Sequence, residues 1–272
     1  MISLRQKYHR KLVLFMRNTF RKDSLLVEVF PSRSLMGQAA AHDIESAVCQ
    51  IIADKGACNI IFAAAPSQNE VLAGLAASEK IDWSKVHAFH MDEYVGISPD
   101  APQGFANFLR TALFKKVPMG KVEYLDCTAD PEKEAKRYSA LLAQFPTDLV
   151  VMGIGENGHI AFNDPHVADF RDPLAVKTVA LDEKCRLQQV HDGCFSDLDT
   201  VPTHAMTLTI PTLCRPAQVF CIVPAKTKAQ AVCDTVNGPI SEVCPASILR
   251  RHPNATLYLD PDSASLLELG NL

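Results

Sequence analysis

The 272-residue sequence has no long apolar run and no excess of basic charge. The apolar run at residues 12–16 is far shorter than the roughly 20 residues of a membrane-spanning helix. It also lacks the small-residue cleavage pattern of a secretory signal. The formal net charge is −4, whereas general nucleic-acid binders usually have a basic surface. We therefore expect a soluble, cytoplasmic protein with no membrane partner and no nucleic-acid partner.

Paired cysteines are missing as well. The nine cysteines, an odd number, include no Cys-x-x-Cys pair. The sequence therefore lacks the clustered ligands that a zinc site needs. We interpret the cysteines as buried, reduced thiols.

Apolar runs alternate with segments of helical period along the chain. This alternation is typical of βαβ units and of a sheet that helices cover on both faces. We predict strands at 25–30, 59–64, 86–91, 122–125, 149–154, 204–210, 219–223 and 257–260, and helices at 35–53, 68–78, 105–114, 131–143 and 226–236. The predicted fold class is α/β, with a mostly parallel sheet between helical layers.

The chain contains no internal repeat and no linker, so we expect a single domain over residues 23–272. Residues 1–22 are basic, and we expect a poorly ordered or peripheral leader there. Residues 166–202 have no clear period and many polar side chains. We interpret this region as a cap or lid over the functional site.

Polar residues stand where four of the apolar runs stop, at 63–68, 91–95, 154–165 and 223–228. In open α/β sheets, ligands bind beyond the carboxyl ends of the strands. We therefore expect these four segments to meet and to form a binding site.

Segment 153–165 has three glycines within six residues, followed directly by His159. Glycine lets the backbone turn sharply and approach a ligand, and histidine can donate and accept protons near neutral pH. Asp164, five residues later, is a candidate for fixing the imidazole tautomer. The residues alone are also compatible with a glycine-rich turn that carries a surface histidine.

Asp92 and Glu93 follow the predicted strand at 86–91. Adjacent strand residues point in opposite directions, so one acid can face the crevice while the other binds a structural donor. A carboxylate with a raised pKa suits removal of a proton next to a carbonyl group. A pair of solvated acids is the alternative.

Two further segments are candidates for binding phosphate. The loop at 63–68, with Ser67 and Gln68, stands between a strand and a helix, where backbone N–H groups and the helix dipole favour an anion. Lys226 and Lys228 follow the strand at 219–223. The alternatives are simple N-capping by Ser67 and a solvated helix start.

Taken together, these segments resemble the glucosamine-6-phosphate deaminase/isomerase family over residues 25–267. The most specific parts are 91–96, Met-Asp-Glu-Tyr-Val-Gly, and 158–165, Gly-His-Ile-Ala-Phe-Asn-Asp-Pro. The related 6-phosphogluconolactonases usually carry Asp-Glu-Arg at the first motif and Thr-Ala-Ser-Leu-Phe-Pro after the Gly-His of the second. The sequence resembles the deaminases at both places.

The resemblance implies a Rossmann-like three-layer αβα sandwich and a set of catalytic residues. Asp92 would carry a proton between C2 and C1 of the sugar, and His159 would protonate the ring oxygen. Asp164 would orient His159, and Asn157 stands where the family usually has aspartate. No metal and no organic cofactor are implied.

The substrate-binding residues that we assign are Ser67, Gln68, Glu93, Gly158 and Lys228. The implied partner is a sugar-phosphate substrate, and the sequence leaves the formation of a homo-oligomer open. The phosphate loop reads Ala-Ala-Pro-Ser-Gln at 64–68, where the family usually has Thr-Gly-Ser/Gly-Thr-Pro. A hydrolase similar to the 6-phosphogluconolactonases, a non-catalytic sugar-phosphate sensor and an unrelated nucleotide-binding protein are the alternative functions.

Overall fold

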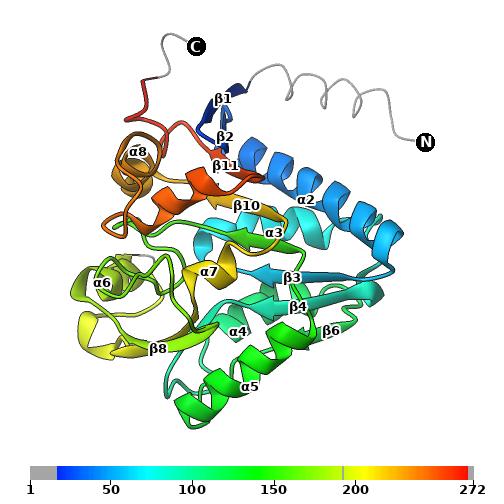
Figure 1. The fold of residues 1–272 in the computed structure, drawn as a ribbon, viewed down its shortest axis with the longest axis vertical. Coiled ribbons are helices and arrows are strands. Elements are labelled where there is room, and N and C mark those ends of the chain that lie inside the picture. The colour runs from blue at the N-terminus through cyan, green and yellow to red at the C-terminus, as the bar shows by residue number, and fades with distance from the viewer. Residues whose placement is uncertain (1–16, 192, 269–272) are drawn as a thin grey trace.

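The structure, a computed structural model, describes residues 17–191 and 193–268. Its main element is an eight-stranded sheet (Figure 1). In spatial order the strands are β1 (Asn18–Lys22), β2 (Leu25–Val29), β11 (Ala255–Leu259), β10 (Gln218–Val223), β7 (Leu149–Met152), β3 (Cys58–Phe62), β4 (Val86–His90) and β6 (Lys121–Glu123). All neighbours pair in parallel except β1 and β2. The sheet is therefore mostly parallel, as predicted.

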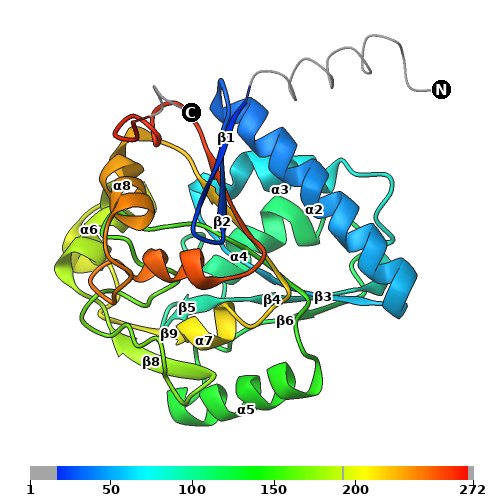
Figure 2. The same ribbon diagram turned by 45° about the horizontal axis from the view of Figure 1, so that its top comes forward.

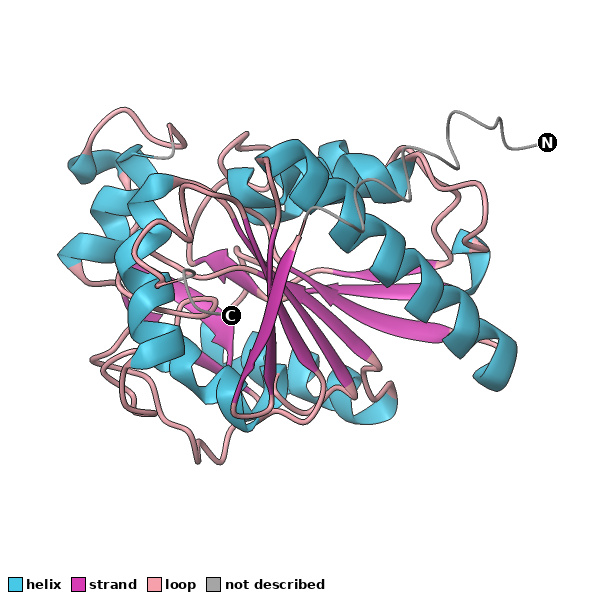
Figure 3. Cartoon of the chain, turned by 90° about the horizontal axis from the view of Figure 1, so that it is seen from above, coloured by secondary structure: helices cyan, strands magenta, loops and turns pink. Residues whose placement is uncertain are grey.

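Helices cover both faces of this sheet (Figure 3). One hydrophobic core lies under α2 (Arg33–Lys55), α3 (Asn69–Ala76) and α4 (Phe105–Leu109). The other lies under α5 (Pro131–Gln144), α7 (Ile210–Leu213) and α8 (Ala229–Asn237). Successive residues of one strand alternate between the cores, since Ile60 and Phe62 belong to the first and Ile61 to the second. This is the predicted three-layer αβα sandwich.

Every predicted strand and helix is present, with its ends displaced by no more than a few residues. Helix α2 shows how local sequence sets these ends. The hydroxyl of Ser32 accepts a hydrogen bond from the Leu35 amide at 3.3 Å, and the helix ends at Gly56, which has a φ of 83°. The first residue of α2 is Arg33, which therefore stands just beyond the end of β2.

A second, three-stranded antiparallel sheet consists of β5 (Asp92–Tyr94), β9 (His204–Leu208) and β8 (Val176–Ala180). Together with α6 (Glu183–His191) it lies at one end of the molecule (Figures 1 and 2). We expected the strand at 204–210 to continue the main sheet, and this was wrong. An apolar run predicts a strand but not its partner, and here the partner is β5, which follows β4 and leaves the main sheet.

The last part of the expected leader, residues 18–22, forms β1, which pairs with β2 from Asn18↔Val29 to Lys22↔Leu25. Residues 1–16 lie outside the described residues. The expected cap at 166–202 contains β8 and α6. Among the helices that the structure describes, none combines the length and the apolar character needed to cross a membrane.

Candidate active site

A cavity of about 530 Å³ opens at the carboxyl ends of β3, β4, β7 and β10. Its lining includes residues of all four segments that we expected to meet, so these strand ends line one cavity. Gln188, Gln189, Gly193 and Cys194 add a further wall, so part of the expected cap region also lines the cavity. The volume suits a small-molecule ligand.

Asp92 is the carboxylate of this cavity; within the described residues no other Asp or Glu lines it. It begins β5, opposite Thr207 of β9, and is only 7% exposed. Burial raises the pKa of Asp92 well above its usual range, and the negative charge of Glu93 raises it further. A carboxylate of this kind holds a proton more firmly than usual, which suits a general base near neutral pH.

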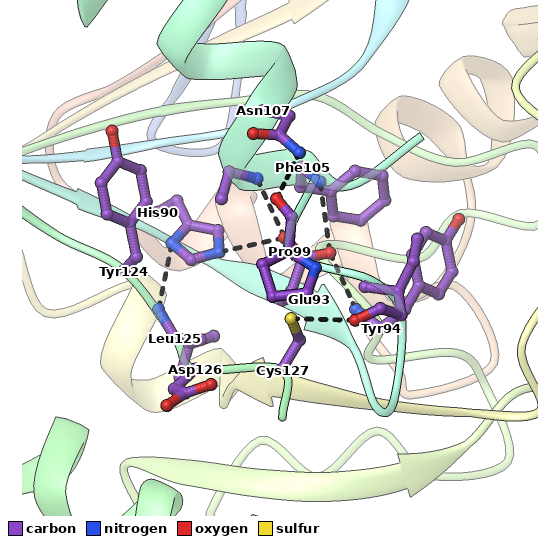
Figure 4. Close-up of polar contacts among 12 residues, drawn as sticks. His90, Glu93, Tyr94, Pro99, Phe105, Asn107, Tyr124, Leu125, Asp126 and Cys127 are labelled. Atoms are coloured by element: carbon purple, nitrogen blue, oxygen red, sulfur yellow. Dashed lines mark hydrogen bonds and ion pairs between the residues drawn. The ribbon is translucent and has the colours of Figure 1, made fainter. Parts of the chain in front are cut away.

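Glu93 faces away from the cavity. Its carboxylate accepts hydrogen bonds from the backbone amides of Tyr94, Phe105 and Ala106 at 3.0, 3.2 and 2.9 Å (Figure 4). Burial opposes its ionisation, but the His90 imidazole, 3.8 Å away, and these amides together lower its pKa. The assignment of Glu93 to substrate binding is therefore not supported by its position. The opposite directions of neighbouring strand residues explain why Asp92 reaches the cavity and Glu93 the start of α4.

The glycine-rich segment after β7 forms a tight turn around the His159 ring. The amide of Gly155 donates to the His159 carbonyl at 2.9 Å. A Cβ atom at Gly155 would lie 2.1 to 2.4 Å from three atoms of the imidazole, so only glycine lets the ring pack here. The three glycines have the spacing Gly-x-Gly-x-x-Gly, but no helix follows them, unlike in dinucleotide-binding loops. The turn therefore positions a histidine instead of cradling a pyrophosphate at a helix start.

His159 is held by two side chains at one ring nitrogen. Its Nδ1 lies 2.8 Å from Asn157 Oδ1 and 2.9 Å from Asp164 Oδ1. The Asn157 amide nitrogen donates to Asp164 Oδ1 at 2.9 Å, which leaves its oxygen toward the imidazole. Both atoms that face Nδ1 are thus acceptors, so Nδ1 carries the proton. Nε2 is then the nitrogen that a ligand in the cavity can use.

Asp164 is fully buried behind His159 and does not line the cavity. Burial alone would raise its pKa, but the neighbouring His159 and the hydrogen bonds from His159 and Asn157 outweigh this and lower it. Asp164 therefore stays ionised, and its contact with Nδ1 holds the His159 ring in one orientation. Asp164 thus contacts the imidazole, as a role in orienting His159 requires.

Cys185 of α6 lies beside the same pair. His159, Asp164 and Cys185 are the one group in the described part of the chain whose potential metal-ligand atoms lie within 4.8 Å of one another. Burial raises the pKa of the Cys185 thiol far above its usual range, so the thiol stays protonated. An ion here would have to displace that proton and the hydrogen bonds between His159, Asn157 and Asp164. The group is better suited to orienting His159 than to holding a metal.

The predicted phosphate loop lines the cavity with Ser67 and Gln68. The buried side-chain amide of Gln68 donates to Ser67 Oγ at 3.0 Å and to the Ile222 carbonyl at 3.2 Å. Because Ser67 Oγ accepts this bond, its own proton is available to a ligand. The contact with Ile222 also joins the loop after β3 to the end of β10, the strand that precedes Lys228.

Lys228 lines the same cavity and is 6% exposed. Gly158 does not line it: with a φ of 83° it shapes the turn, and a Cβ atom there would lie 2.8 Å from Cys244 Sγ. Gly158 therefore has a backbone role, and its position does not support the expected contact with substrate. Arg33 also lines the cavity, although it was not among the predicted site residues. The sequence feature that could have indicated Arg33 is its place just after the predicted strand at 25–30. The end of this strand was not among the four strand ends expected to form the site.

The chain is similar to known proteins of one family. Residues 31–258 match the family described as glucosamine-6-phosphate isomerases/6-phosphogluconolactonase. The glucosamine-6-phosphate deaminase of Exiguobacterium sibiricum is 37% identical over 191 residues, which are 70% of this chain and 73% of that protein. The glucosamine-6-phosphate deaminase of Lactobacillus delbrueckii subsp. bulgaricus is 36% identical over 219 residues, 79% of this chain and 90% of that protein.

Solved structures agree with the fold. A monomeric glucosamine-6-phosphate deaminase superposes with a TM-score of 0.81 at 28% identity, covering 88% of this chain and 99% of that one. The 6-phosphogluconolactonase of Thermotoga maritima gives a TM-score of 0.71 at 19% identity, covering 87% of this chain and 99% of that one. The second likeness concerns the fold alone. Both confirm the predicted fold class.

Proposed function

The chain belongs to the family of glucosamine-6-phosphate isomerases and 6-phosphogluconolactonases, and from this premise we propose that it is an enzyme that converts glucosamine 6-phosphate to fructose 6-phosphate and ammonia. The observation that carries the proposal is that Asp92 and His159, from different strand ends, line one cavity. The reaction needs a base at C2 of the sugar and an acid at the ring oxygen. These two side chains are of the matching types.

Ring opening is the first step. His159, oriented by Asp164, acts as the general acid and donates a proton from Nε2 to the ring oxygen. The anomeric hydroxyl loses its proton to water, and the C1–O5 bond breaks. The product is the open-chain sugar with an aldehyde at C1.

Proton transfer between C2 and C1 follows. Asp92 takes the C2 proton, and the electron pair of that C–H bond forms a C1–C2 double bond. The π electrons of the aldehyde move to its oxygen, which takes a proton from water. Asp92 then returns its proton to C1, which leaves an imine at C2. Water adds to this imine and ammonia leaves, giving the ketone. One water molecule is consumed and no oxidant or reductant is needed.

The phosphate group would bind where Ser67 and Lys228 line the cavity. Ser67 has its hydroxyl proton available, and Lys228 brings a positive charge. The backbone amides of the loop at 63–68 add neutral donors, except at Pro66, which has no N–H. Anchoring the phosphate leaves the carbon atoms of the sugar for Asp92 and His159.

The direct test is to incubate the protein with glucosamine 6-phosphate and to follow ammonia and fructose 6-phosphate. Formation of both in equal amounts is expected. If neither forms but the ligand raises the melting temperature, the protein is a sensor and the proposal is wrong. Hydrolysis of 6-phosphogluconolactone without exchange of a C2 proton in deuterated water would favour the hydrolase. A panel of hexose and hexosamine phosphates would define the preferred sugar.

We also place the protein in a reducing compartment, the cytoplasm. Four of the nine cysteines, Cys58, Cys127, Cys185 and Cys221, are buried, and burial raises the pKa of each of these thiols. Buried, protonated thiols of this kind are typical of proteins that never meet an oxidising environment. Localisation of a tagged full-length chain tests this assignment.

A further inference from the structure

Arg33 stands at the edge of the phosphate loop. It is the first residue of α2, and it lines the same cavity as Ser67 and Lys228. The three residues follow three different strands, β2, β3 and β10. The carboxyl ends of these strands lie on one edge of the parallel sheet, so their side chains can converge on one group.

Two hydrogen bonds fix the guanidinium of Arg33. Its Nε donates to Glu70 Oε1 at 2.8 Å, and its Nη2 donates to the Pro66 carbonyl at 2.7 Å. Both bonds use the Nε–Nη2 side of the planar group. Among residues 17–191 and 193–268, no side chain or carbonyl accepts from Nη1. The Nη1–Nη2 end therefore keeps donors for another acceptor, and the side chain is 37% exposed.

The charges around the cavity indicate which ligand group the Nη1–Nη2 end of Arg33 can bind. Apart from His159, the basic side chains of the described lining are Arg33 and Lys228, and the acidic one is Asp92. A phosphate monoester carries between one and two negative charges near neutral pH. Glu70 offsets part of the charge of Arg33, so Arg33 would act mainly through directed hydrogen bonds. A planar fork of donors suits two phosphate oxygens better than a lysine does.

We propose that Arg33 binds the phosphate group of the substrate through its Nη1–Nη2 end, together with Ser67 and Lys228. The proposal rests on the proposed function for the identity of the substrate. Glu70 and the Pro66 carbonyl are the groups that aim the guanidinium. The loop and the arginine thus form one unit, in which Arg33 both braces Pro66 and contacts the ligand.

The test compares Arg33→Ala and Arg33→Lys with Arg137→Ala. Arg137 is a matched control, because it is braced in the same way, by Glu134 at 2.7 Å and by the Tyr124 carbonyl at 2.8 Å, and it does not line the cavity. We expect Arg33→Ala to raise KM for glucosamine 6-phosphate about 10- to 100-fold, the effect of losing a charged hydrogen bond, with a much smaller change in kcat. The KM of Arg33→Lys should lie between those of Arg33→Ala and the unaltered protein. The KM of Arg137→Ala should equal that of the unaltered protein.

Binding of inorganic phosphate, measured by calorimetry without turnover, separates this inference from the proposed function. Arg33→Ala should weaken phosphate binding by a similar factor while leaving the weak binding of unphosphorylated glucosamine unchanged. If the protein deaminates its substrate and Arg33→Ala alters neither KM nor phosphate binding, the inference is wrong and the function stands. If no turnover occurs but phosphate binding depends on Arg33, the function is wrong and the phosphate site stands. Equal weakening of phosphate and glucosamine binding would mean that Arg33 only braces the loop.

Discussion

Asp92 and Glu93 are neighbours in β5 whose carboxylates face opposite sides of the strand. Asp92 lines the cavity, whereas Glu93 accepts the Phe105 and Ala106 amides at the start of α4. Burial raises the pKa of Asp92, and the negative charge of Glu93 raises it further. Glu93 therefore stabilises the start of α4 and raises the pKa of Asp92, which is the acid that lines the cavity.

Asp92→Asn should abolish the exchange of the C2 proton. Asparagine keeps the size of the side chain but cannot take a proton, so kcat should fall by about 10²-fold or more. Proton NMR of the substrate in deuterated water measures the exchange, and calorimetry with inorganic phosphate checks that the cavity is intact. Full exchange in this variant would remove Asp92 from the mechanism.

The same substitution should stabilise the protein at neutral pH. An acid whose pKa is raised on folding costs stability as pH rises from its ordinary value of 3.8 through its folded value, because the folded state holds the proton longer. Asp92→Asn removes this cost. We expect Tm at pH 7 to rise by about 2–4 °C, the shift that roughly 1 kcal/mol gives in a domain of this size. Asp100→Asn, at an exposed position, is the control and should leave Tm unchanged.

Glu93→Gln should move the acid limb of the rate profile to lower pH. Asp92 works in its ionised form, and the negative charge of Glu93 raises its pKa. Without that charge Asp92 ionises at a lower pH. A pH profile of kcat/KM measures the shift, and Glu123→Gln, which removes a carboxylate outside the cavity lining, should leave it in place. An acid limb that moves upward in Glu93→Gln would contradict the assignment.

Asp164→Asn should reduce the enzymatic activity. It should also reduce the amount of stability that the protein loses as pH falls. The pKa of Asp164 is lowered on folding, so it stabilises the protein above its ordinary value of 3.8, and this contribution is lost as pH falls through the lowered value. Without the carboxylate, kcat should fall about 10²- to 10⁴-fold. Urea unfolding at pH 6 and pH 3 should show a smaller difference in the variant. The exposed Asp199→Asn is the comparison, and a variant as acid-sensitive as the original would speak against the ion pair.

Tyr94→Phe and Tyr138→Phe should have opposite effects on stability. The Tyr94 ring is fully buried near Phe105 and Phe162, and in the described structure its hydroxyl has no hydrogen-bond partner. The Tyr138 hydroxyl reaches the carbonyls of His90 and Glu123 at 2.9 and 3.0 Å.

Removing an unpaired buried hydroxyl should stabilise the protein by about 1 kcal/mol, and removing a paired one should destabilise it by a similar amount. Denaturant unfolding measures both changes. A loss of stability in Tyr94→Phe equal to that in Tyr138→Phe would mean that the Tyr94 hydroxyl has a partner.

The local pattern of apolar and polar residues in the sequence predicted most of the fold. The continuous apolar run at 149–154 predicted a strand covered on both faces, and the segments of helical period on either side of it predicted helices. The rule that ligands bind beyond the carboxyl ends of parallel strands then located the cavity. Asp92, His159, Ser67 and Lys228 could be predicted because each stands within a few residues of such an end.

The sequence by itself determined the strands, the helices and the edge of the sheet where chemistry is placed, because these depend on the periodicity of neighbouring residues. Only the tertiary structure decided which strand pairs with β9 and that Glu93 accepts hydrogen bonds at the start of α4. It also decided that Asn157 shares the Nδ1 atom of His159 with Asp164, and that Arg33 donates to the Pro66 carbonyl. These relationships join residues whose contacts depend on the direction of each side chain after packing. For residues in loops, such as Asn157, spacing along the chain does not fix that direction.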